Sequence, residues 1–374
     1  MEEVLFETKG LSYSYNSRQE RPSLNDVNVR VRKGVKTAIL GANGAGKSTL
    51  FYHFNGIFKP KEGEVLYEGR PIDYSKDELC KLRSDICVVV QNPDEQIFSA
   101  TVEEDIAFGP MNMGLERDEV ERRICDSLFK VGMEEYRCRP TTQLSYGQRK
   151  RVAIAGALAV EPKVLILDEP TAGLDPQISL EVIELVDQLC ANGTTVVIST
   201  HDVDLAYTWA EEIHVLRKGN LIYSGEPEPF FSDREQVSLA GLAVPHTFSV
   251  NSTVETIRGR PEVPYPKTNS QLLSKMLPEG SVSGRLKLVG VSPEDGPGII
   301  DGSIGFKGIY GFNTRRLFRD NGLEVDFYFN AIESCMIEAL DGRDATLFCD
   351  SSLLEAVRSH ISTLERFGHG LEVV

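Results

Sequence analysis

Apolar residues recur between residue 4 and about residue 225 as short runs that alternate with stretches of helical period. This pattern is typical of an α/β domain with a largely parallel sheet. The expected strands are Thr37–Leu40, the run from Val164 and Thr195–Ser199, and the helices after them start at Lys47, after Pro176 and at His201. A hairpin around Lys218-Gly219-Asn220 would close the domain. We assign residues 1–240 to it, with a helical subdomain at about 75–150.

The periodicity fades beyond residue 240. Prolines accumulate from Pro227 to Pro266, which predicts a short helical tail and then a linker at 241–284. A second alternation favours a smaller α/β domain at 285–374. Its expected strands are Leu286–Val291, Glu324–Phe329, Ala345–Cys349 and Leu371–Val374, its expected helices are Ile332–Leu340 and Ser352–Phe367, and a glycine-rich stretch extends to Gly311.

Composition and charge narrow the function. The chain has 374 residues and a formal net charge of −16, which argues against a nucleic-acid partner because such binding depends on Lys and Arg. Arg149, Lys150 and Arg151 could still form a local basic patch. No apolar run reaches the roughly 18 residues of a membrane span. The seven cysteines lack metal-site spacing, which favours reduced thiols in a cytosolic protein.

The segment after Thr37–Leu40 fits a phosphate-binding loop between a strand and a helix. It consists of Gly41, Ala42, Asn43, Gly44, Ala45, Gly46, Lys47, Ser48 and Thr49. Its backbone N–H groups would surround a β-phosphate, Lys47 would reach the β and γ oxygens, and Ser48 would ligate magnesium. We therefore expect a bound nucleotide with Mg²⁺.

Asp168 and Glu169 end the apolar run that starts at Val164. P-loop ATPases need a carboxylate at this strand end, so Asp168 is the expected magnesium ligand. Glu169 is the candidate catalytic base, because it lies beside the metal ligand and could orient a water. A helix cap or a pair of surface carboxylates is the alternative.

Three further residues are ambiguous from their positions alone. Gln91 follows an apolar strand at Cys87–Val90 and could be an ordinary loop residue. His201 lies between a strand and a helix, where it could reach a γ-phosphate or be satisfied by the backbone. Tyr15 could stack on a purine, but strand alternation puts it on the same face as Tyr13, which favours core packing.

The segment Leu144–Gln148 reads Leu-Ser-Tyr-Gly-Gln and precedes a basic helical stretch. Its Ser-x-Gly-Gln turn would open a helix and offer a hydroxyl and backbone N–H groups to a second anion. One chain would then carry two different phosphate-facing surfaces. This arrangement predicts a head-to-tail dimer.

The order and spacing of these motifs resemble those of ATP-binding-cassette ATPases over residues 4 to about 230. Within that superfamily, Val90–Pro110 is similar to the ATPases of energy-coupling-factor importers, including the cobalt and nickel importers. The resemblance implies an ATP-hydrolysing importer subunit, peripheral on the cytoplasmic face of the cell membrane. Cobalt or nickel is the expected cargo, and a vitamin is the alternative. A soluble cassette ATPase acting on nucleic acid or ribosomes is a more distant reading, since neither a long coiled coil nor a second cassette is present.

The resemblance also implies roles for residues within the chain's own site. Tyr15 would stack on adenine, and His201 would act as a switch. Gln91 would sense magnesium and the γ-phosphate and would link the site to the membrane partner. The loop from Asp94 to Phe108 would receive a helix of an integral membrane component.

Other residues would act on a second cassette subunit. The resemblance implies that Ser145, Gly147 and Gln148 contact the γ-phosphate held by that subunit, while Asp175 bridges the two sites. Tyr146 departs from the family signature, which has glycine there, and we treat it as a variant. Nothing as specific occurs after residue 285, where we expect a regulatory or dimer-supporting role.

Overall fold

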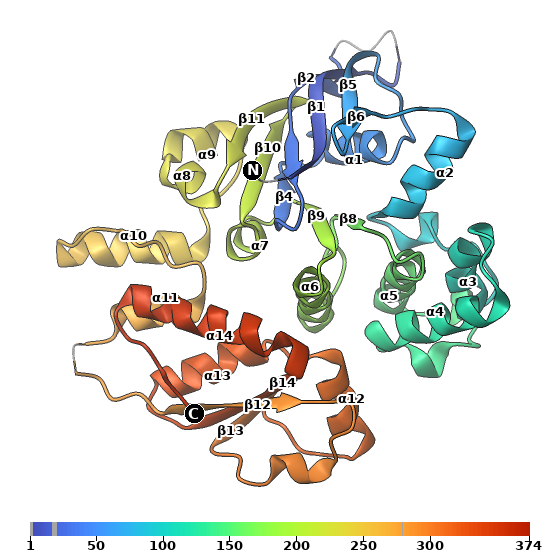
Figure 1. Cartoon of the computed structure of the whole chain (residues 1–374). Coiled ribbons are helices and arrows are strands. Elements are labelled where there is room, and N and C mark those ends of the chain that lie inside the picture. Colours follow the sequence, from blue (N-terminus) through green and yellow to red (C-terminus); the bar gives the residue numbers. More distant parts are fainter. Residues whose placement is uncertain (1–2, 17–20, 279) are drawn as a thin grey trace. The chain divides into compact units, whose positions relative to one another are not determined.

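The computed structural model describes residues 3–16, 21–278 and 280–374 of the chain. The chain divides into two compact units, Met1–Val244 and Pro245–Val374 (Figure 1). Each unit has its own sheets and its own hydrophobic core. No helix among the residues so described is long and apolar enough to cross a membrane.

A six-stranded sheet of order β11-β10-β4-β9-β8-β7 forms the centre of the first unit. Its strands are β4 (Thr37–Leu40), β7 (Ile86–Val89), β8 (Val164–Asp168), β9 (Thr195–Thr200), β10 (Glu212–Arg217) and β11 (Asn220–Gly225). All neighbours pair in parallel except β10 and β11, which form the expected hairpin. Every residue of β8 and β9 is buried, so these strands appear in the sequence as continuous apolar runs.

A second sheet of the first unit is antiparallel and was not expected. It consists of β1 (Val4–Tyr13), β2 (Leu24–Val27), β3 (Arg30–Arg32), β5 (Glu62–Tyr67) and β6 (Arg70–Pro71). Its buried face shares a core with helix α1 (Lys47–Phe54), where the rings of Phe6 and Phe54 stack at 4.6 Å. Apart from the ten-residue β1, these strands have two to six residues, and many of their positions are exposed, so they give a weaker pattern than the buried central strands.

Most remaining helices of the first unit lie where the pattern predicts them. They are α2 (Lys76–Asp85), α3 (Val102–Asn112), α4 (Arg117–Lys130), α5 (Tyr146–Leu158), α6 (Pro176–Ala191), α7 (Val203–Trp209), α8 (Pro227–Ser232) and α9 (Arg234–Ala240). Helix α7 starts two residues beyond the expected His201, because the Asp202 side chain accepts the N–H groups of Asp204 and Leu205 and thus caps the helix.

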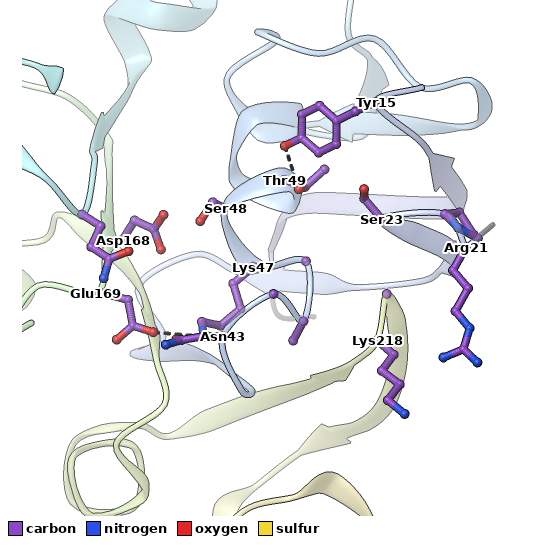
Figure 2. A pocket seen from close by; sticks show the side chains of 16 residues that line it. Tyr15, Arg21, Ser23, Asn43, Lys47, Ser48, Thr49, Asp168, Glu169 and Lys218 are labelled. Carbon is purple, nitrogen blue, oxygen red and sulfur yellow. Dashed lines mark hydrogen bonds and ion pairs between the residues drawn. The ribbon is translucent and has the colours of Figure 1, made fainter. Parts of the chain in front are cut away.

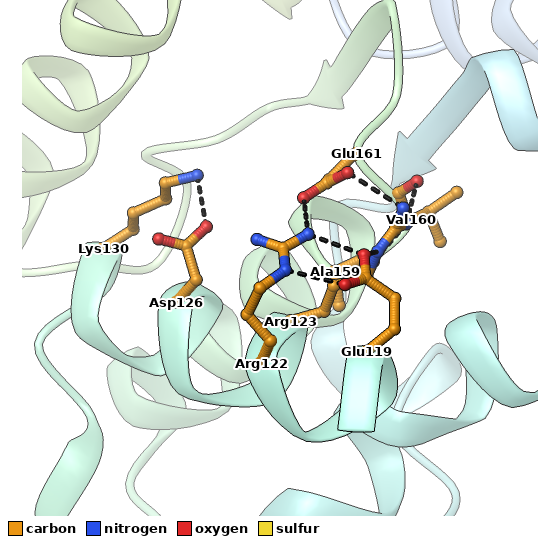
Figure 3. Close-up of polar contacts among 8 residues, drawn as sticks. All are labelled: Glu119, Arg122, Arg123, Asp126, Lys130, Ala159, Val160 and Glu161. Atoms are coloured by element: carbon orange, nitrogen blue, oxygen red, sulfur yellow. Dashed lines mark hydrogen bonds and ion pairs between the residues drawn. The ribbon is translucent and has the colours of Figure 1, made fainter. Parts of the chain in front are cut away.

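Helices α3, α4 and α5 pack together in the helical subdomain. Arg123 of α4 fixes the end of α5: its Nη1 donates to the carbonyls of Ala159 (3.2 Å) and Val160 (2.9 Å), as Figure 3 shows. The same guanidinium forms ion pairs with Glu119 and Glu161. The last carbonyls of a helix have no partner within it, so this arginine satisfies groups that α5 leaves open.

The second unit contains a four-stranded parallel sheet of order β13-β14-β12-β15. Its strands are β12 (Arg285–Val291), β13 (Phe306–Tyr310), β14 (Ala345–Asp350) and β15 (Glu372–Val373), and helices α12 (Phe312–Asp320), α13 (Ala331–Leu340) and α14 (Leu354–Ser362) accompany them. The expected strand Glu324–Phe329 is wrong. Only an isolated bridge joins Gly308 to Phe327, while Leu323, Val325 and Phe327 pack against the core from a loop.

The expected linker at 241–284 is also wrong, because two helices of the second unit lie there: α10 (His246–Arg258) and α11 (Asn269–Met276). Several of their contacts are polar, although Phe248 of α10 stacks on Tyr265 and Leu273 of α11 packs against the core. The Lys275 ammonium donates to Asn251 Oδ1 (2.8 Å) and to two main-chain carbonyls, and the N–H and hydroxyl of Ser270 donate to Glu333 at 2.6 and 2.9 Å. Helices that bury polar groups lack the apolar periodicity by which sequence analysis detects them.

Candidate nucleotide-binding site

The loop between β4 and α1 has the geometry of an anion cradle. Gly44 and Gly46 have φ angles of +76° and +110°, which glycine adopts without the steric penalty of a side chain. A Cβ on Gly46 would lie 2.7 Å from the carbonyl oxygen of Ser23. Helix α1 begins at Lys47, so its unpaired N-terminal N–H groups and dipole face this loop.

Lys47 is buried at the start of α1 and forms two close contacts. Its Nζ donates to the carbonyl of Gly41 at 2.6 Å and lies 2.9 Å from Glu169 Oε1 (Figure 2). A buried ammonium is costly without partners, so these contacts stabilise it in the free chain. The same ammonium is the group expected to reach the phosphates.

Asp168 and Glu169 are both buried at the carboxyl end of β8. Ser199 of β9 lies opposite Asp168 in the sheet; its hydroxyl donates to Asp168 Oδ1 and accepts the backbone N–H of Glu169 at 3.0 Å. Glu169 has a φ of +46°, which is unusual for a residue with a side chain. Ser199 thus fixes the backbone that directs Glu169. The available sequence signal for Ser199 was a hydroxyl side chain near the end of an apolar strand.

His201 contacts the other oxygen of Glu169. Its Nδ1 lies 2.9 Å from Glu169 Oε2, while more than half of its side chain remains exposed. The two carboxylate oxygens of Glu169 therefore face different partners, Lys47 and His201. The alternative of a histidine satisfied by the backbone at a helix start does not match this contact.

Tyr15 lies outside the hydrophobic core. It is 51% exposed, its hydroxyl is 3.0 Å from Thr49 Oγ1, and its ring meets those of Tyr13 and Phe58 edge-on. The expected core packing is wrong for this residue, because β1 ends at Tyr13 and strand alternation stops there. Tyr13 is the ring that packs, stacked on Phe58 at 4.9 Å.

These groups line one cavity of about 620 Å³. Of the expected residues, it is lined by Tyr15, Asn43, Gly44, Ala45, Gly46, Lys47, Ser48, Thr49, Gln91, Asp168 and Glu169. Gly41, Ala42 and His201 lie outside the lining. Sequence analysis missed five lining residues: Arg21, Pro22, Ser23, Lys218 and Gly219. Figure 2 shows Arg21, Ser23 and Lys218 at the end of the cavity away from Glu169. The Gly219 N–H donates to the carbonyl of Ala45 at 3.0 Å, so the β10–β11 hairpin contacts the phosphate-binding loop.

The second expected phosphate surface does not line this cavity. Ser145 is the N-cap of α5: its hydroxyl accepts the Gln148 N–H at 3.2 Å, and the Gln148 side chain accepts the Ser145 N–H at 2.9 Å. Gly147 is buried, and a Cβ there would lie 2.7 Å from Ile178 Cδ1. Asp175 caps α6 by accepting the Ile178 N–H at 2.9 Å. The two sets of motif residues are therefore separate within one chain.

The expected basic patch is absent from the surface. Arg149 forms an ion pair with Asp94 at 2.6 Å, Arg151 forms one with Glu181 at 3.0 Å, and Lys150 is fully buried. The prediction of a patch is wrong because each cation is used within the fold. In the sequence Lys150 lies between Arg149 and Arg151, and no local signal distinguishes it from these two arginines.

A family model described as ABC transporter matches residues 24–172, and many curated relatives are similar in sequence. The energy-coupling factor transporter ATP-binding protein EcfA of Methanothermobacter thermautotrophicus is 50% identical over 243 residues, which cover 65% of this chain and 78% of that protein. The protein EcfA2 of Methanospirillum hungatei is 36% identical over an alignment of 374 positions, which covers 96% of this chain and 93% of that protein.

Many solved structures are similar in fold, including the following two. The first is cbiO1 of Clostridium perfringens, part of the ABC transporter complex cbiONQ, with 42% identity, a TM-score of 0.58, and coverage of 68% of this chain and 100% of that one. The second is a dimeric ATP-binding cassette in a post-hydrolysis state with ADP and Pi. It has 31% identity and a TM-score of 0.55, and the match covers 60% of this chain and 99% of that one.

Proposed function

Because the chain belongs to the family of energy-coupling factor transporter ATP-binding proteins, which are ATP-binding-cassette ATPases, we propose that it powers a membrane importer. The chain binds ATP in the cavity at the N-terminal end of α1 and hydrolyses it. The observation that carries this proposal is the position of Glu169, whose two carboxylate oxygens contact Lys47 and His201 beside Asp168. A nucleophile-orienting carboxylate next to a phosphate-binding lysine is the arrangement that ATP hydrolysis needs.

ATP fits the cavity in one orientation. The glycine loop and the start of α1 hold the phosphates at one end, where Lys47 and Glu169 lie. Tyr15 lines the same cavity, with its hydroxyl 3.0 Å from Thr49 Oγ1 and its ring accessible, so it stacks on adenine. When phosphate oxygens approach Lys47, they take the place of Glu169 at the ammonium and release that carboxylate to orient water.

The cavity also fits Mg²⁺. Ser48, Gln91 and Asp168 line it and provide the oxygen ligands that this ion prefers. The ion, when bound, neutralises charge on the phosphates. Ser199 orients Asp168 through a buried hydrogen bond, and His201 contacts Glu169 Oε2. The two carboxylates therefore have different roles: Asp168 ligates the ion, and Glu169 orients the water.

The working unit is a head-to-tail pair of cassettes, formed by two copies of this chain or by one copy and a related subunit. Ser145, Gly147 and Gln148 lie at the start of α5, outside the chain's own cavity, and we assign them to the γ-phosphate held by the partner. Asp175 at the start of α6 bridges the two sites. The dimeric cassette among the similar structures supports this arrangement.

An integral membrane component docks near α3. Phe98 and Met111 are 64% and 65% exposed, and the Phe98 ring meets that of Phe108 edge-on at 4.6 Å. These apolar side chains suit a helix of the membrane partner, and with that partner the chain would be peripheral on the cytoplasmic face of the membrane. We propose cobalt or nickel as the cargo because Val90–Pro110 resembles the importers of those ions, with a vitamin as the alternative.

Glu169→Gln tests the catalytic assignment. The variant should bind ATP with wild-type or higher affinity and lose turnover by at least about 100-fold, because the amide cannot accept a proton from water. ATPase rates and nucleotide binding are measured on the full chain. Glu62→Gln, an exposed change on β5, is the control. A wild-type rate in Glu169→Gln would remove Glu169 from this role.

Purification from membranes tests the importer assignment. The chain should be recovered with integral membrane proteins, and vesicles containing the complex should accumulate radioactive cobalt or nickel when ATP is supplied. Accumulation of a vitamin instead would select the alternative cargo. Recovery of ribosomes or DNA without membrane proteins would contradict the importer function.

A further inference from the structure

Helix α5 holds the main chain of Gln91 through two side chains. The Tyr146 hydroxyl donates to the Gln91 carbonyl at 3.3 Å, and the Lys150 ammonium donates to the same carbonyl at 2.9 Å. Lys150 also donates to the carbonyl of Val90 at 2.9 Å. The two residues are one helical turn apart, so they meet one acceptor from one face of α5.

The contacts continue along the first turns of α5. Arg149 forms an ion pair with Asp94 at 2.6 Å, and the Gln96 side chain donates to the carbonyl of Ala153 at 3.4 Å. The same Gln96 accepts the Val90 N–H at 3.1 Å, which closes the loop on itself. The segment Val90–Gln96, which we call the glutamine loop, is thus fastened to α5 at several successive points.

Lys150 makes this attachment difficult to break. Its side chain is fully buried. Its ammonium donates to the carbonyls of Val90 and Gln91 in the glutamine loop. If the loop left α5, the ammonium would lose these acceptors, which is costly for a buried charge.

Tyr146 adds a third element to this contact. Gly173, in the loop between Glu169 and Asp175, has a φ of +75°, and a Cβ there would lie only 3.2 Å from Cε1 of the Tyr146 ring. The ring therefore lies close to the backbone of that loop. A glycine at position 146, as in the general signature, could make neither the ring contact nor the hydrogen bond to Gln91.

We propose that Tyr146 and Lys150 are positioning residues that make the glutamine loop and the start of α5 move as one body. Gln91 lines the chain's own cavity, whereas Ser145 at the start of α5 is assigned to the partner's nucleotide. The attachment therefore couples the position of Gln91 in the chain's own cavity to the position of Ser145 at the partner's nucleotide. The expected effect on kcat rests on the proposed ATPase function. The attachment of the loop to α5 does not depend on that function.

Kinetics of conservative variants test the inference in the full chain. Tyr146→Phe removes one hydroxyl, and Lys150→Met removes the charge while it keeps the length of the side chain. Each should lower kcat for ATP about threefold to tenfold and change KM less than about twofold, because the phosphate-binding loop is untouched. Lys150→Gln retains N–H donors and should recover most of the rate. Tyr136→Phe and Lys130→Met, elsewhere in the helical subdomain, are the matched controls.

Because both donors share the Gln91 carbonyl, the double variant Tyr146→Phe/Lys150→Met should lose less than the product of the single losses. Wild-type kcat in both single variants would overturn the proposal. So would an increase in KM equal to the loss in kcat, or equal losses in Lys150→Gln and Lys150→Met, since these outcomes indicate a general disturbance of the fold.

Hydrogen exchange measured without nucleotide tests the attachment independently of catalysis. Amides of residues 90–96 should exchange faster in Tyr146→Phe and Lys150→Met than in the wild type, while those of α4 remain unchanged. Unchanged exchange at 90–96 would overturn the attachment. A wild-type chain that fails to hydrolyse ATP but shows the expected exchange would contradict the proposed function and leave the attachment supported.

Discussion

Ser199 shows how one hydroxyl can set the geometry of a catalytic site. It bonds the side chain of Asp168 and the backbone N–H of Glu169, which has a left-handed φ. Ser199→Ala should lower kcat about tenfold with little change in the KM for ATP, because it releases both carboxylates but leaves the phosphate loop intact. Steady-state ATPase assays measure this. The control is Ser232→Ala on the surface, and an unchanged kcat in Ser199→Ala would show that β8 alone fixes Glu169.

His214 predicts how the stability of the first unit depends on pH. It is fully buried in β10, with Nδ1 2.9 Å from Ser224 Oγ, and burial lowers its pKa to about 4. The unfolded chain has a histidine pKa near 6.5, so between pH 6.5 and 4 it binds a proton that the folded chain does not. The stabilisation is therefore complete above pH 6.5 and is lost as pH falls through 4. It amounts to about 3 kcal/mol at most.

Denaturant unfolding at pH 7, 6, 5 and 4.5 measures this effect. His214→Gln removes the titrating group and should show a smaller loss of unfolding free energy on acidification than the wild type. The exposed His201→Gln change serves as the control for histidine titration elsewhere in the unit. Parallel pH curves for wild type and His214→Gln would contradict the assignment.

The residues of the site were predictable where chemistry is tied to a local motif. Lys47, Asp168 and Glu169 lie in strand-to-loop contexts that the sequence displays, and they line one cavity. Ser199 and Lys150 were not predictable, because their partners lie 31 and about 60 positions away and only the sheet and α5 bring them together. Tyr15 was misplaced because the end of β1 could not be read from alternation alone.

At the scale of elements, the attachment of α5 to α4 can be tested with adjacent arginines. Arg123 is 12% exposed and donates to the terminal carbonyls of α5, whereas Arg122 is 52% exposed and pairs only with surface carboxylates in Figure 3. Arg123→Met should lower the free energy of unfolding by about 1–3 kcal/mol, because it leaves the carbonyls of Ala159 and Val160 without their donor, while Glu161 keeps its ion pair with Arg122. Arg122→Met should have no measurable effect, since exposed ion pairs contribute little.

Urea unfolding followed by circular dichroism compares the two variants under identical conditions. Equal destabilisation would contradict the role of buried hydrogen bonds and would favour a charge effect of the whole α4 surface. The comparison is well matched, because the two positions are neighbours on one helix and both variants lose one positive charge. The result separates the satisfaction of the α5 terminus from simple ion pairing.

Elements differed in how far the sequence predicted them, for a physical reason. Strands β8 and β9 are buried on both faces, so their apolar runs are unambiguous. Helices α10 and α11 bury polar side chains such as Asn251 and Ser274 beside a few apolar ones, so their apolar stripe is interrupted and weak in the sequence. The segment Glu324–Phe329 alternates as a strand would, yet its apolar residues reach the core from a loop without a ladder of hydrogen bonds.

At the scale of the whole molecule, the chain combines a complete cassette with a second compact unit. A relative that is 36% identical aligns with 96% of this chain, so its alignment also covers residues of the second unit. The cavity, by contrast, is lined entirely by residues of the first unit. Nucleotide binding and the second unit are therefore separable by experiment, and we propose that Pro245–Val374 supports the dimer or regulates it.

A chain that ends at Val244 tests this division at the natural boundary between the units. It should bind ATP with an affinity within about threefold of the full chain, because it retains every residue that lines the cavity. Loss of a dimer contact would raise the dissociation constant of the dimer by at least about tenfold, which corresponds to about 1.4 kcal/mol. ATPase activity per chain would then fall at low protein concentration and recover at high concentration.

Sedimentation velocity and ATPase assays over a range of protein concentrations distinguish the outcomes of this truncation. A concentration-dependent loss of activity supports a dimer contact in the second unit. A rate altered equally at all concentrations, with unchanged dimerisation, supports regulation instead, since the catalytic unit then responds to its neighbour within one chain. The shortened chain keeps all residues that form the cavity. If its ATPase rate, its response to ATP and its dimerisation were all unchanged, both proposed roles of the second unit would be contradicted.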